Sequence, residues 1–248
     1  MVVRIVGRKD QLIKENYNGA VRERKVLGFP QEQSPMKPYS NIFYWSHLSS
    51  DFGCVITEHP LIGFEILTYV IKGSYETYDK SADKWEKLNV GDLGIIQAGK
   101  GIRQAEKILP RSEVLQIWFD PNFDEYRKIS PVMSHYSSNS FPEDGDDFEV
   151  VKTLKGKNAP IRLNAQEVSI HMLNLKPGIH HLENHEDFIL SGYVLNGYLD
   201  LQGKTLSMYD FFSTDKNEIT LNSLSESQVF LITSPLKPEY QTYAEMHL

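Results

Sequence analysis

The sequence predicts an all-β protein with a sandwich or barrel architecture. Short apolar segments recur along the chain, and residues that favour turns, such as Gly, Asn, Asp and Pro, separate them. Residues 114–119, for example, are rich in β-branched and aromatic side chains and end at Asp120-Pro121. Many short strands at regular spacing are typical of sandwiches and barrels. Helical periodicity is rare, and we expect one short helix around residues 121–126.

The expected strands fall into two groups, one in each half of the chain. Each strand is a run rich in Val, Ile, Leu, Phe or Tyr, which are residues that fit a pleated, half-buried surface. The first group comprises residues 66–71, 93–96 and 114–119, and the second comprises residues 168–173, 188–190, 192–195 and 229–232.

The two halves also resemble each other in sequence. Residues 69–76 match residues 193–200, with a Tyr-Val start and a glycine at the same place in each window. Each window is followed by a segment that begins with Leu and ends with Asp, residues 88–92 and residues 206–210. Matched windows within one chain indicate a duplicated unit.

A polar stretch lies between the two copies. Residues 134–147 are rich in Ser, Asp and Glu, which is typical of a linker. We therefore predict two domains, residues 1–135 and residues 136–248, as two barrels in tandem.

Composition limits the classes of function. With 40% hydrophobic and 24% charged residues, the 248-residue chain has the composition of a globular protein. Its net charge of −7 argues against binding to nucleic acid or to an anionic membrane. No apolar run reaches the roughly 18 residues that span a bilayer, and the short apolar start is not a signal peptide. One cysteine, Cys54, excludes an internal disulfide, so we expect a cytoplasmic protein.

Two segments carry residue types that bind metals. If each segment is extended, His59 and Leu61 share one face of a strand, and Gln104 and Glu106 share one face of another. Imidazole and carboxylate are common ligands of transition metals, whereas an isobutyl group has no donor atom and an amide is a weak ligand. Half of a four-residue metal site is therefore present at these positions.

The chain resembles the cupin superfamily and, more narrowly, the pirin family. The first cupin motif corresponds to Gly53-x5-His59-x-Leu61-x3-Glu65-x7-Gly73. The second corresponds to Gly91-Asp92-x5-Ala98-Gly99-Lys100-Gly101. Pirins carry His-Pro-His-Arg-Gly-x-Glu-Thr-Val-Thr-Tyr where this chain has residues 59–69, and Ala-Gly-x-Gly-Ile-x-His-Ser-Glu at residues 98–106.

This resemblance implies two tandem cupin barrels, the first of which usually holds iron through three His and one Glu. His59 falls on the first ligand position and Glu106 on the fourth, while Leu61 and Gln104 replace the second and third. The metal set carried over is thus His59, Gln104 and Glu106. The expected cofactor is one divalent metal (Fe, Mn or Ni), weakly bound or absent.

Three interpretations of this reduced site remain open. Glu65 would complete an oxygen-rich set with His59, Gln104 and Glu106, which suits Mn or Mg better than Fe. Alternatively, the polar side chains hydrogen-bond one another without any metal. The third interpretation is an organic ligand held in the same cavity by converging polar groups.

The second half offers a different candidate. If residues 180–185 are extended, His181, Glu183 and His185 share a face and form the residue set of a facial triad. Three histidines in so short and polar a stretch are also typical of a solvated loop.

The leading functional hypothesis is a pirin-like protein with a degenerate iron site that binds small molecules or acts in regulation. Its expected ligand is a small aromatic or enol molecule in the N-terminal barrel, and a protein partner follows from family analogy alone. The alternative is a metal-dependent, quercetin 2,3-dioxygenase-like enzyme, in which Glu106 as the catalytic residue takes the proton of a bound enol. No nucleic acid or membrane is expected as a partner.

Overall fold

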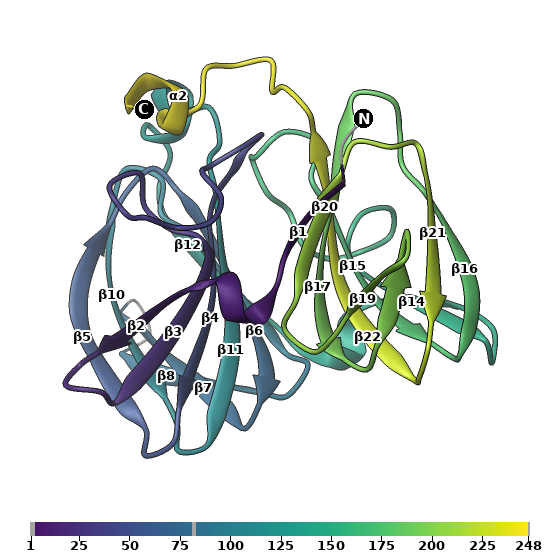
Figure 1. Ribbon diagram of the computed structural model, residues 1–248. Helices are drawn as coiled ribbons and strands as arrows, with labels where there is room; N and C mark the ends of the chain where they lie inside the picture. Colours follow the sequence, from purple (N-terminus) through teal and green to yellow (C-terminus); the bar gives the residue numbers. More distant parts are fainter. Residues whose placement is uncertain (1–2, 81–82, 248) are drawn as a thin grey trace. The chain divides into compact units, whose positions relative to one another are not determined.

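The computed structural model describes residues 3–80 and 83–247, and this part of the chain is nearly all β (Figure 1). Its strands form four antiparallel sheets, two in each of two barrels. The all-β prediction is confirmed, and the expected short helix is α1 (Phe123–Tyr126). No helix within the described ranges is long and apolar enough to cross a membrane.

The first barrel consists of a seven-stranded sheet in the order β12-β9-β6-β11-β4-β3-β2 and a four-stranded sheet in the order β5-β10-β7-β8. Its strands are β2 (Leu12–Asn16), β3 (Val21–Leu27), β4 (Ile42–Ser50), β5 (Cys54–Leu61), β6 (Glu65–Lys72), β7 (Ser74–Asp79), β8 (Lys84–Asn89), β9 (Leu93–Gln97), β10 (Ile102–Ile108), β11 (Ser112–Phe119) and β12 (Val132–Tyr136).

The second barrel has the same plan, with a seven-stranded sheet in the order β1-β20-β17-β22-β15-β14-β13 and a four-stranded sheet in the order β16-β21-β18-β19. Its strands are β1 (Val3–Val6), β13 (Glu143–Gly145), β14 (Glu149–Lys155), β15 (Ser169–Leu175), β16 (Gly178–Glu183), β17 (Phe188–Asn196), β18 (Leu199–Leu201), β19 (Lys204–Leu206), β20 (Phe211–Thr214), β21 (Glu218–Ser223) and β22 (Ser227–Pro235). The remaining short elements are η1 (Arg8–Asp10), η2 (Ser138–Ser140) and α2 (Tyr243–His247).

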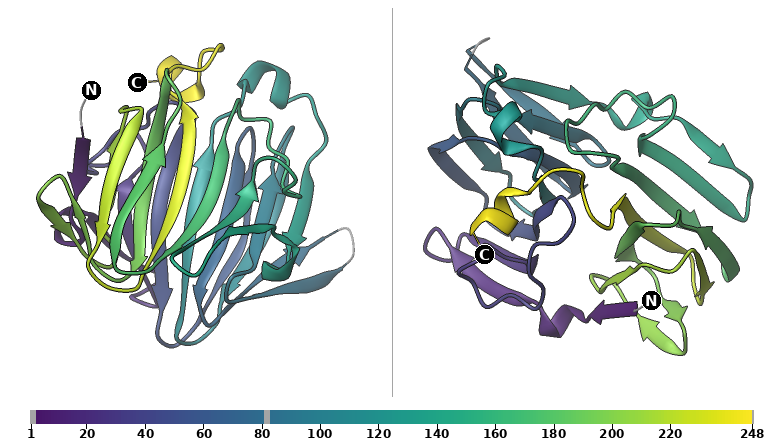
Figure 2. Two further views of the ribbon diagram at one scale, coloured as in Figure 1. Left: turned by 90° about the vertical axis from the view of Figure 1, so that its right-hand side faces the viewer. Right: turned by 90° about the horizontal axis from the view of Figure 1, so that it is seen from above.

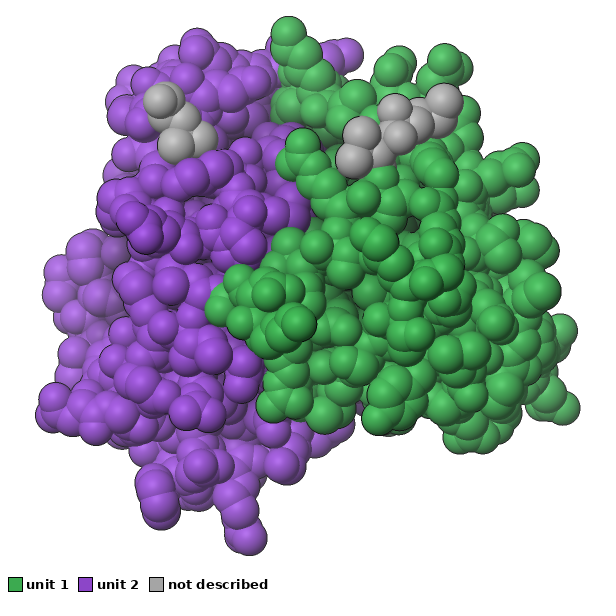
Figure 3. All heavy atoms as spheres, in the orientation of Figure 1, with its two compact units in different colours: residues 1–11, 139–162, 166–238 green, residues 12–138, 163–165, 239–248 purple. Residues whose placement is uncertain are grey.

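The chain divides into two compact units, coloured separately in Figure 3. Unit 2 contains the first barrel and comprises Leu12–Ser138, Leu163–Ala165 and Glu239–Leu248. The described residues of unit 1, which contains the second barrel, lie within Met1–Gln11, Asn139–Arg162 and Gln166–Pro238. Each unit therefore includes residues from the opposite end of the sequence.

The duplication seen in the sequence is also present in the hydrogen bonds of the turns. In unit 2 the backbone N–H of Gly91 donates to the Val70 carbonyl at 2.9 Å. In unit 1 the N–H of Tyr209 donates to the Val194 carbonyl at 2.7 Å. The segments that end in Asp92 and Asp210 thus close the same turn against equivalent strands, β6 and β17.

The matching glycines sit in equally crowded places. Gly73 has φ +70° and Gly197 has φ +86°, a left-handed conformation that favours glycine. A Cβ atom on Gly73 would lie 2.2 Å from Ser112 Oγ, and one on Gly197 would lie 2.2 Å from Ser227 Oγ. Both positions need glycine for two reasons at once, the backbone angle and the close approach of a neighbouring strand.

The polar stretch 134–147 is only partly a linker. β12 pairs with β9 at the edge of one sheet, and β13 pairs with β14 at the edge of another. Edge strands face solvent along one side and tolerate charged residues, so the acidic composition that suggested a linker is compatible with a strand.

The C-terminal helix α2 belongs to the first barrel, as Figure 2 shows for the yellow segment marked C. The Asp120 carboxylate accepts a hydrogen bond from the Ala244 N–H at 3.1 Å, and the Tyr240 hydroxyl donates to the Asp120 carbonyl at 2.7 Å. The Tyr243 ring lies 5.4 Å from the Phe64 ring and 5.2 Å from the Phe123 ring. Burial raises the pKa of Asp120 to about 6.

Candidate functional site

A cavity of about 510 Å³ opens within the first barrel. Side chains from both of its sheets line this cavity, which makes it the natural place for a ligand. The lining residues are Lys14, Asn16, Tyr17, Glu23, Lys25, Phe29, Glu32, Tyr44, Leu48, Ile56, His59, Glu106, Gln116 and Trp118. Two of the three predicted metal-site residues, His59 and Glu106, are thus brought to one cavity.

His59 lies on β5, directly opposite Gln104 on β10. Its Nδ1 atom is 3.0 Å from the Thr57 carbonyl oxygen. Because a carbonyl can only accept, Nδ1 carries the proton that is donated there. In the neutral ring this leaves the Nε2 lone pair available to a ligand. A β-bulge follows, since the pairing shifts between Gln104 and Glu106, and it changes the aim of the side chains around it.

Glu106 is the buried acid of this cavity, with a side chain that is 5% exposed. Burial raises the pKa of Glu106, because the charged form loses its hydration, and the neighbouring Tyr75 hydroxyl and His59 ring partly offset this effect. The carboxyl group is therefore easier to protonate than an exposed glutamate, and in that form it can donate a hydrogen bond as well as accept one.

Leu61 and Gln104 lie elsewhere in the barrel wall. Leu61 is buried in an apolar cluster with Ile66 and Ile96. Gln104 is fully buried, and its Nε2 donates to the Ala105 carbonyl at 2.9 Å. Its Oε1 has no hydrogen-bond partner among the residues that the structure describes. Neither residue is among those that line the cavity.

This donor set does not fit the iron that the family resemblance implies. Iron sites of this kind need three or four imidazole and carboxylate donors that converge on one point. Across residues 3–80 and 83–247, no group of three or more His, Cys, Asp or Glu side chains is placed to hold a metal ion. His59 and Glu106 supply two donors, and Gln104 adds at most one neutral oxygen.

Glu65 does not complete the set, contrary to one of the interpretations of the sequence. Its carboxylate is fully buried and accepts hydrogen bonds from the backbone N–H groups of Asn164 and Ala165 at 2.8–2.9 Å. The side chains of Asn164 and Gln97 donate to it as well, at 3.0 and 2.7 Å. Glu65 thus holds the segment Leu163–Ala165 against β6, and its lone pairs are occupied.

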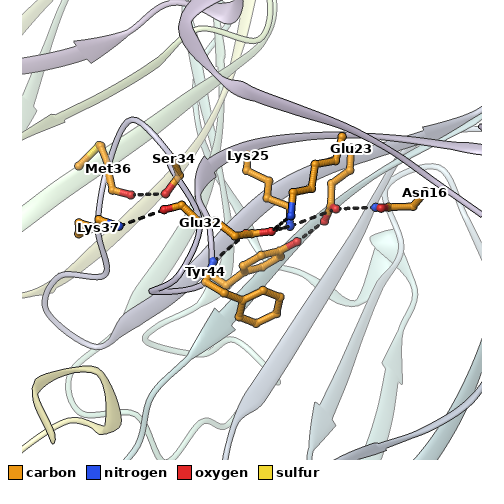
Figure 4. A network of polar contacts seen from close by, with 10 residues as sticks. Asn16, Glu23, Lys25, Glu32, Ser34, Met36, Lys37 and Tyr44 are labelled. Atoms are coloured by element: carbon orange, nitrogen blue, oxygen red, sulfur yellow. Dashed lines mark hydrogen bonds and ion pairs between the residues drawn. The ribbon is translucent and has the colours of Figure 1, made fainter. Parts of the chain in front are cut away.

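A buried charge cluster forms part of the cavity wall and was not predicted from the sequence (Figure 4). The Lys25 ammonium lies 2.9 and 3.0 Å from the two carboxylate oxygens of Glu32 and 3.3 Å from Glu23. The Tyr44 hydroxyl donates to Glu23, and so does the Asn16 amide, at 2.8 Å. Lys25 is only 3% exposed, so this cluster is a permanent part of the wall.

The cluster fixes charges on the wall. Burial alone would raise the pKa of Glu32, but hydrogen bonds from Lys14 and Lys25 hold it below the usual value. Lys25 also lies 5.3 Å from the Phe29 ring centre and 5.1 Å from that of Tyr44. Alternating charges on a strand such as β3 ordinarily indicate a solvent-exposed face, so the sequence carried no signal for a buried cluster.

The histidine-rich segment of the second barrel contributes to the lining of a cavity, but within the described residues it forms no cluster that could hold a metal ion. His181 and Glu183 do share a face of β16, but that face is exposed, as is His185 beyond the strand. The residues that face inward are His180, Leu182 and Asn184. His180 is engaged with the Glu149 carboxylate at 2.7 Å and with the Lys176 carbonyl at 2.8 Å.

Part of the chain is similar to proteins of one known family. A family model described as "Pirin" matches residues 20–119. Human "Pirin" is 29% identical over 109 residues, which is 42% of this chain, and the chain spans 37% of the human protein. An Escherichia coli O157:H7 protein named "Quercetin 2,3-dioxygenase" is 26% identical over 184 residues, 71% of this chain and 75% of that protein.

The fold agrees with that of a solved bacterial structure. The pirin YhhW of Escherichia coli, solved in complex with nickel(II), has a TM-score of 0.79 and 20% identity, and the match covers 94% of this chain and 99% of that one. The two barrels are therefore cupin barrels in the pirin arrangement. The chain is therefore similar to pirins over residues 20–119, and its fold is that of a bacterial pirin.

Proposed function

We propose that the first barrel binds a small aromatic molecule that carries an enol or hydroxyl group, and that this binding requires no metal. The observation that carries the proposal is the cavity itself. Its wall combines the rings of Phe29, Tyr44 and Trp118 with the polar pair His59 and Glu106. Pockets of this kind, largely apolar with a few polar groups that fix orientation, are typical of small-molecule sites.

The polar pair suits a ligand that both donates and accepts hydrogen bonds. The Nε2 lone pair of His59 accepts from a ligand hydroxyl, since Nδ1 is committed to the Thr57 carbonyl. Glu106 accepts when ionised and donates when protonated. The Tyr44 ring is stacked on Phe29 at 4.8 Å, and the half-buried ring of Trp118, 5.5 Å from that of Tyr44, is the one against which a planar ligand can pack.

The degenerate metal site is the second part of the proposal. Its support is that Leu61 packs in an apolar cluster and Gln104 offers one amide oxygen, so the motif positions supply two strong donors. Affinity for a transition metal depends on how many ligands converge. We expect the purified protein to retain far less than one Fe, Mn or Ni ion per chain.

The test is calorimetric titration with quercetin after treatment with a chelator, because a relative is named for this flavonol. We expect saturable binding of one molecule in the first barrel. The variants His59→Ala and Glu106→Gln should each weaken it about tenfold, the effect of losing one good hydrogen bond. Binding that appears only after addition of Ni(II) or Fe(II) would overturn the metal-independent proposal.

A gain-of-function variant provides the matched control for the metal. Leu61→His with Gln104→His restores the family's donor types at the two replaced positions. We expect this double variant to retain about one Ni(II) per chain after dialysis, while the parent protein retains little. Equal retention by both proteins would show that the parent site is already competent.

A metal-dependent dioxygenase is the second candidate function. It is favoured by the unpartnered Gln104 Oε1, a buried acceptor opposite His59 on the neighbouring strand. This candidate predicts oxygen consumption with quercetin in the presence of Fe(II), Mn(II) or Ni(II), and its loss in Gln104→Leu. Oxygen uptake at the rate of the metal salt alone would exclude it.

A further inference from the structure

We propose that the second barrel holds a binding site of its own, for an uncharged small molecule with an apolar body and a hydroxyl or N–H group. This inference is independent of the function proposed for the first barrel. An open cavity of about 400 Å³ lies in unit 1 and is lined by residues of β14, β15, β16, β17 and β22 and by Asn184 and His185 beyond β16. That volume is within the range of pockets that take small organic ligands.

The floor of this cavity belongs to the apolar core of the barrel. Leu173, Leu182, Leu190 and Leu231 are 2–8% exposed and pack in one hydrophobic cluster, while also lining the cavity. Apolar walls favour a ligand with a hydrocarbon body, because its burial removes apolar surface from water.

Uncharged polar groups stand on the same face of the sheet as these leucines. His171 lies directly opposite Leu231, and Ser169 lies opposite Thr233. Residues directly opposite each other in a sheet project to the same side, and all of these residues line the cavity. Burial lowers the pKa of His171, which keeps its ring neutral near pH 7.

Asn184 adds an acceptor that has no donor. Its Nδ2 donates to the Phe188 carbonyl at 2.9 Å. Its Oδ1 has no hydrogen-bond partner within the described residues, although the side chain is only 7% exposed. A buried acceptor without a partner costs free energy, and a ligand hydroxyl or N–H group would supply the missing bond.

Charge decides the class of ligand. The two carboxylates among the lining residues are Glu149, which is engaged with His180, and Glu183. Besides His171, the exposed side chains of His181 and His185 also line the cavity. No lysine or arginine is among the described lining residues, so a bound anion would meet two carboxylates and lose hydration without gaining an ammonium or guanidinium partner. Uncharged ligands avoid that cost.

A pair of photoreactive probes tests this site directly. 4-Hydroxybenzophenone is uncharged when its phenol is protonated, and 4-benzoylbenzoate has a similar body but carries a carboxylate. After irradiation of the whole protein, we expect 4-hydroxybenzophenone to label peptides that contain β15 and β22. Labelling by 4-benzoylbenzoate should be about tenfold weaker, as expected for burial of an unpaired charge.

Two variants separate this site from the cavity of the first barrel. Ser169→Trp fills the second cavity and should reduce labelling of β15 and β22 at least about fivefold. Gln116→Trp fills the first cavity and should leave that labelling unchanged. If Ser169→Trp does not fold, as judged by circular dichroism, Thr233→Phe takes its place.

The outcomes are distinct for the two proposals. Labelling that is confined to β3, β4 and β11 and lost in Gln116→Trp would overturn the second site and leave the first intact. Equal labelling by the two probes at β15 and β22 would overturn the ligand class. If Gln116→Trp loses quercetin binding but keeps the labelling of β15 and β22, the two sites are independent, as proposed.

Discussion

The two barrels share their turns and differ in their interiors. Gly73 and Gly197 make the same close approach to a serine on a neighbouring strand. Inside the first barrel, the cavity is lined by ionisable groups such as Glu106 and Lys25. Inside the second, no lysine or arginine is among the described lining residues, and leucines such as Leu182 and Leu231 from the apolar core line the cavity beside Glu149 and His171. Duplicated backbone geometry is thus kept where a turn demands it, while the chemistry of the cavities has diverged.

Two buried carboxylates of the first barrel, Glu65 and Glu106, have different roles. Glu65 on β6 accepts hydrogen bonds from four donor groups, which belong to Asn164, Ala165 and Gln97. At the corresponding place on β17, counted from the matching glycine, the second barrel has Ile189. A buried acid in one copy therefore serves to hold a segment of chain, and a buried acid nearby, Glu106, faces the cavity.

The largest expected effect is the loss of Glu65. Glu65→Ala leaves several buried N–H donors without partners, each of which costs about 1–3 kcal/mol. We expect the free energy of unfolding to fall by at least about 3 kcal/mol in urea titrations. Glu65→Gln keeps the shape and one acceptor and should lose less. The matched change in the second barrel is Ile189→Ala, which truncates a half-buried side chain and should cost less stability than Glu65→Ala. A loss for Glu65→Ala as small as that for Ile189→Ala would contradict the role of Glu65 in holding residues 163–165.

The next effect depends on pH and is specific to the first barrel. Burial raises the pKa of Asp120 to about 6, above the ordinary value of 3.8 for an aspartate. The folded state therefore binds a proton more tightly than the unfolded state, so this group adds stability as pH falls from about 6 to about 4. Its contribution is lost again as pH rises through the folded pKa. The full difference is roughly 3 kcal/mol, at 1.36 kcal/mol per pKa unit.

Asp120→Asn measures this contribution. The amide keeps an acceptor for the Ala244 N–H but cannot titrate, so the difference in unfolding free energy between parent and variant should change across this pH interval. Parallel stability curves for the two proteins would show that Asp120 titrates normally.

The two glycines provide a test of equivalence. In both Gly73→Ala and Gly197→Ala, the new methyl group meets a serine while the backbone remains left-handed. We expect each variant to lose about 2 kcal/mol of stability, since such strain costs about 1–3 kcal/mol. Differential scanning calorimetry of the two variants measures these losses. A loss of stability in only one of the two variants would contradict the shared turn geometry.

The smallest expected effect concerns the charge cluster of the first cavity. Tyr44→Phe removes one hydrogen bond to Glu23 and keeps the ring, and it should cost about 1–2 kcal/mol in thermal unfolding. The matched control is Tyr193→Phe on β17 of the second barrel, which also removes a hydroxyl group from a fully buried ring. A Tyr44→Phe protein as stable as the parent would mean that Asn16 and Lys25 alone satisfy Glu23.

The sequence predicted the strands and turns, which depend on neighbouring residues, and missed contacts between residues that are far apart in the chain. The strands, the duplicated windows and the helix at α1 follow from hydrophobic pattern and turn residues, both of which are local. The partners of Glu65 lie about a hundred residues along the chain, at Asn164 and Ala165. Nothing near Glu65 in the sequence indicates that its carboxylate is occupied.

The sequence also failed to predict which face of some strands points into the barrel. The sequence placed His181, Glu183 and His185 on one face as a candidate facial triad, but in the structure Leu182 and Asn184 are the buried side chains. A strand has a side-chain period of two, so a shift of one residue moves every side chain to the opposite face. In the first barrel, the bulge between β5 and β10 causes a comparable shift near His59, and sequence alone gives no sign of it.

The exchange of terminal segments between the units has a consequence for biosynthesis. β1 pairs with β20, Val3 opposite Thr214, so the second barrel can recruit its first strand only after β20 has left the ribosome. The first barrel waits longer, because α2 and Tyr240 complete it. At about 5–20 residues per second, a nascent chain spends many seconds with an unpaired strand and an incomplete barrel, when chaperones and proteases have their best access.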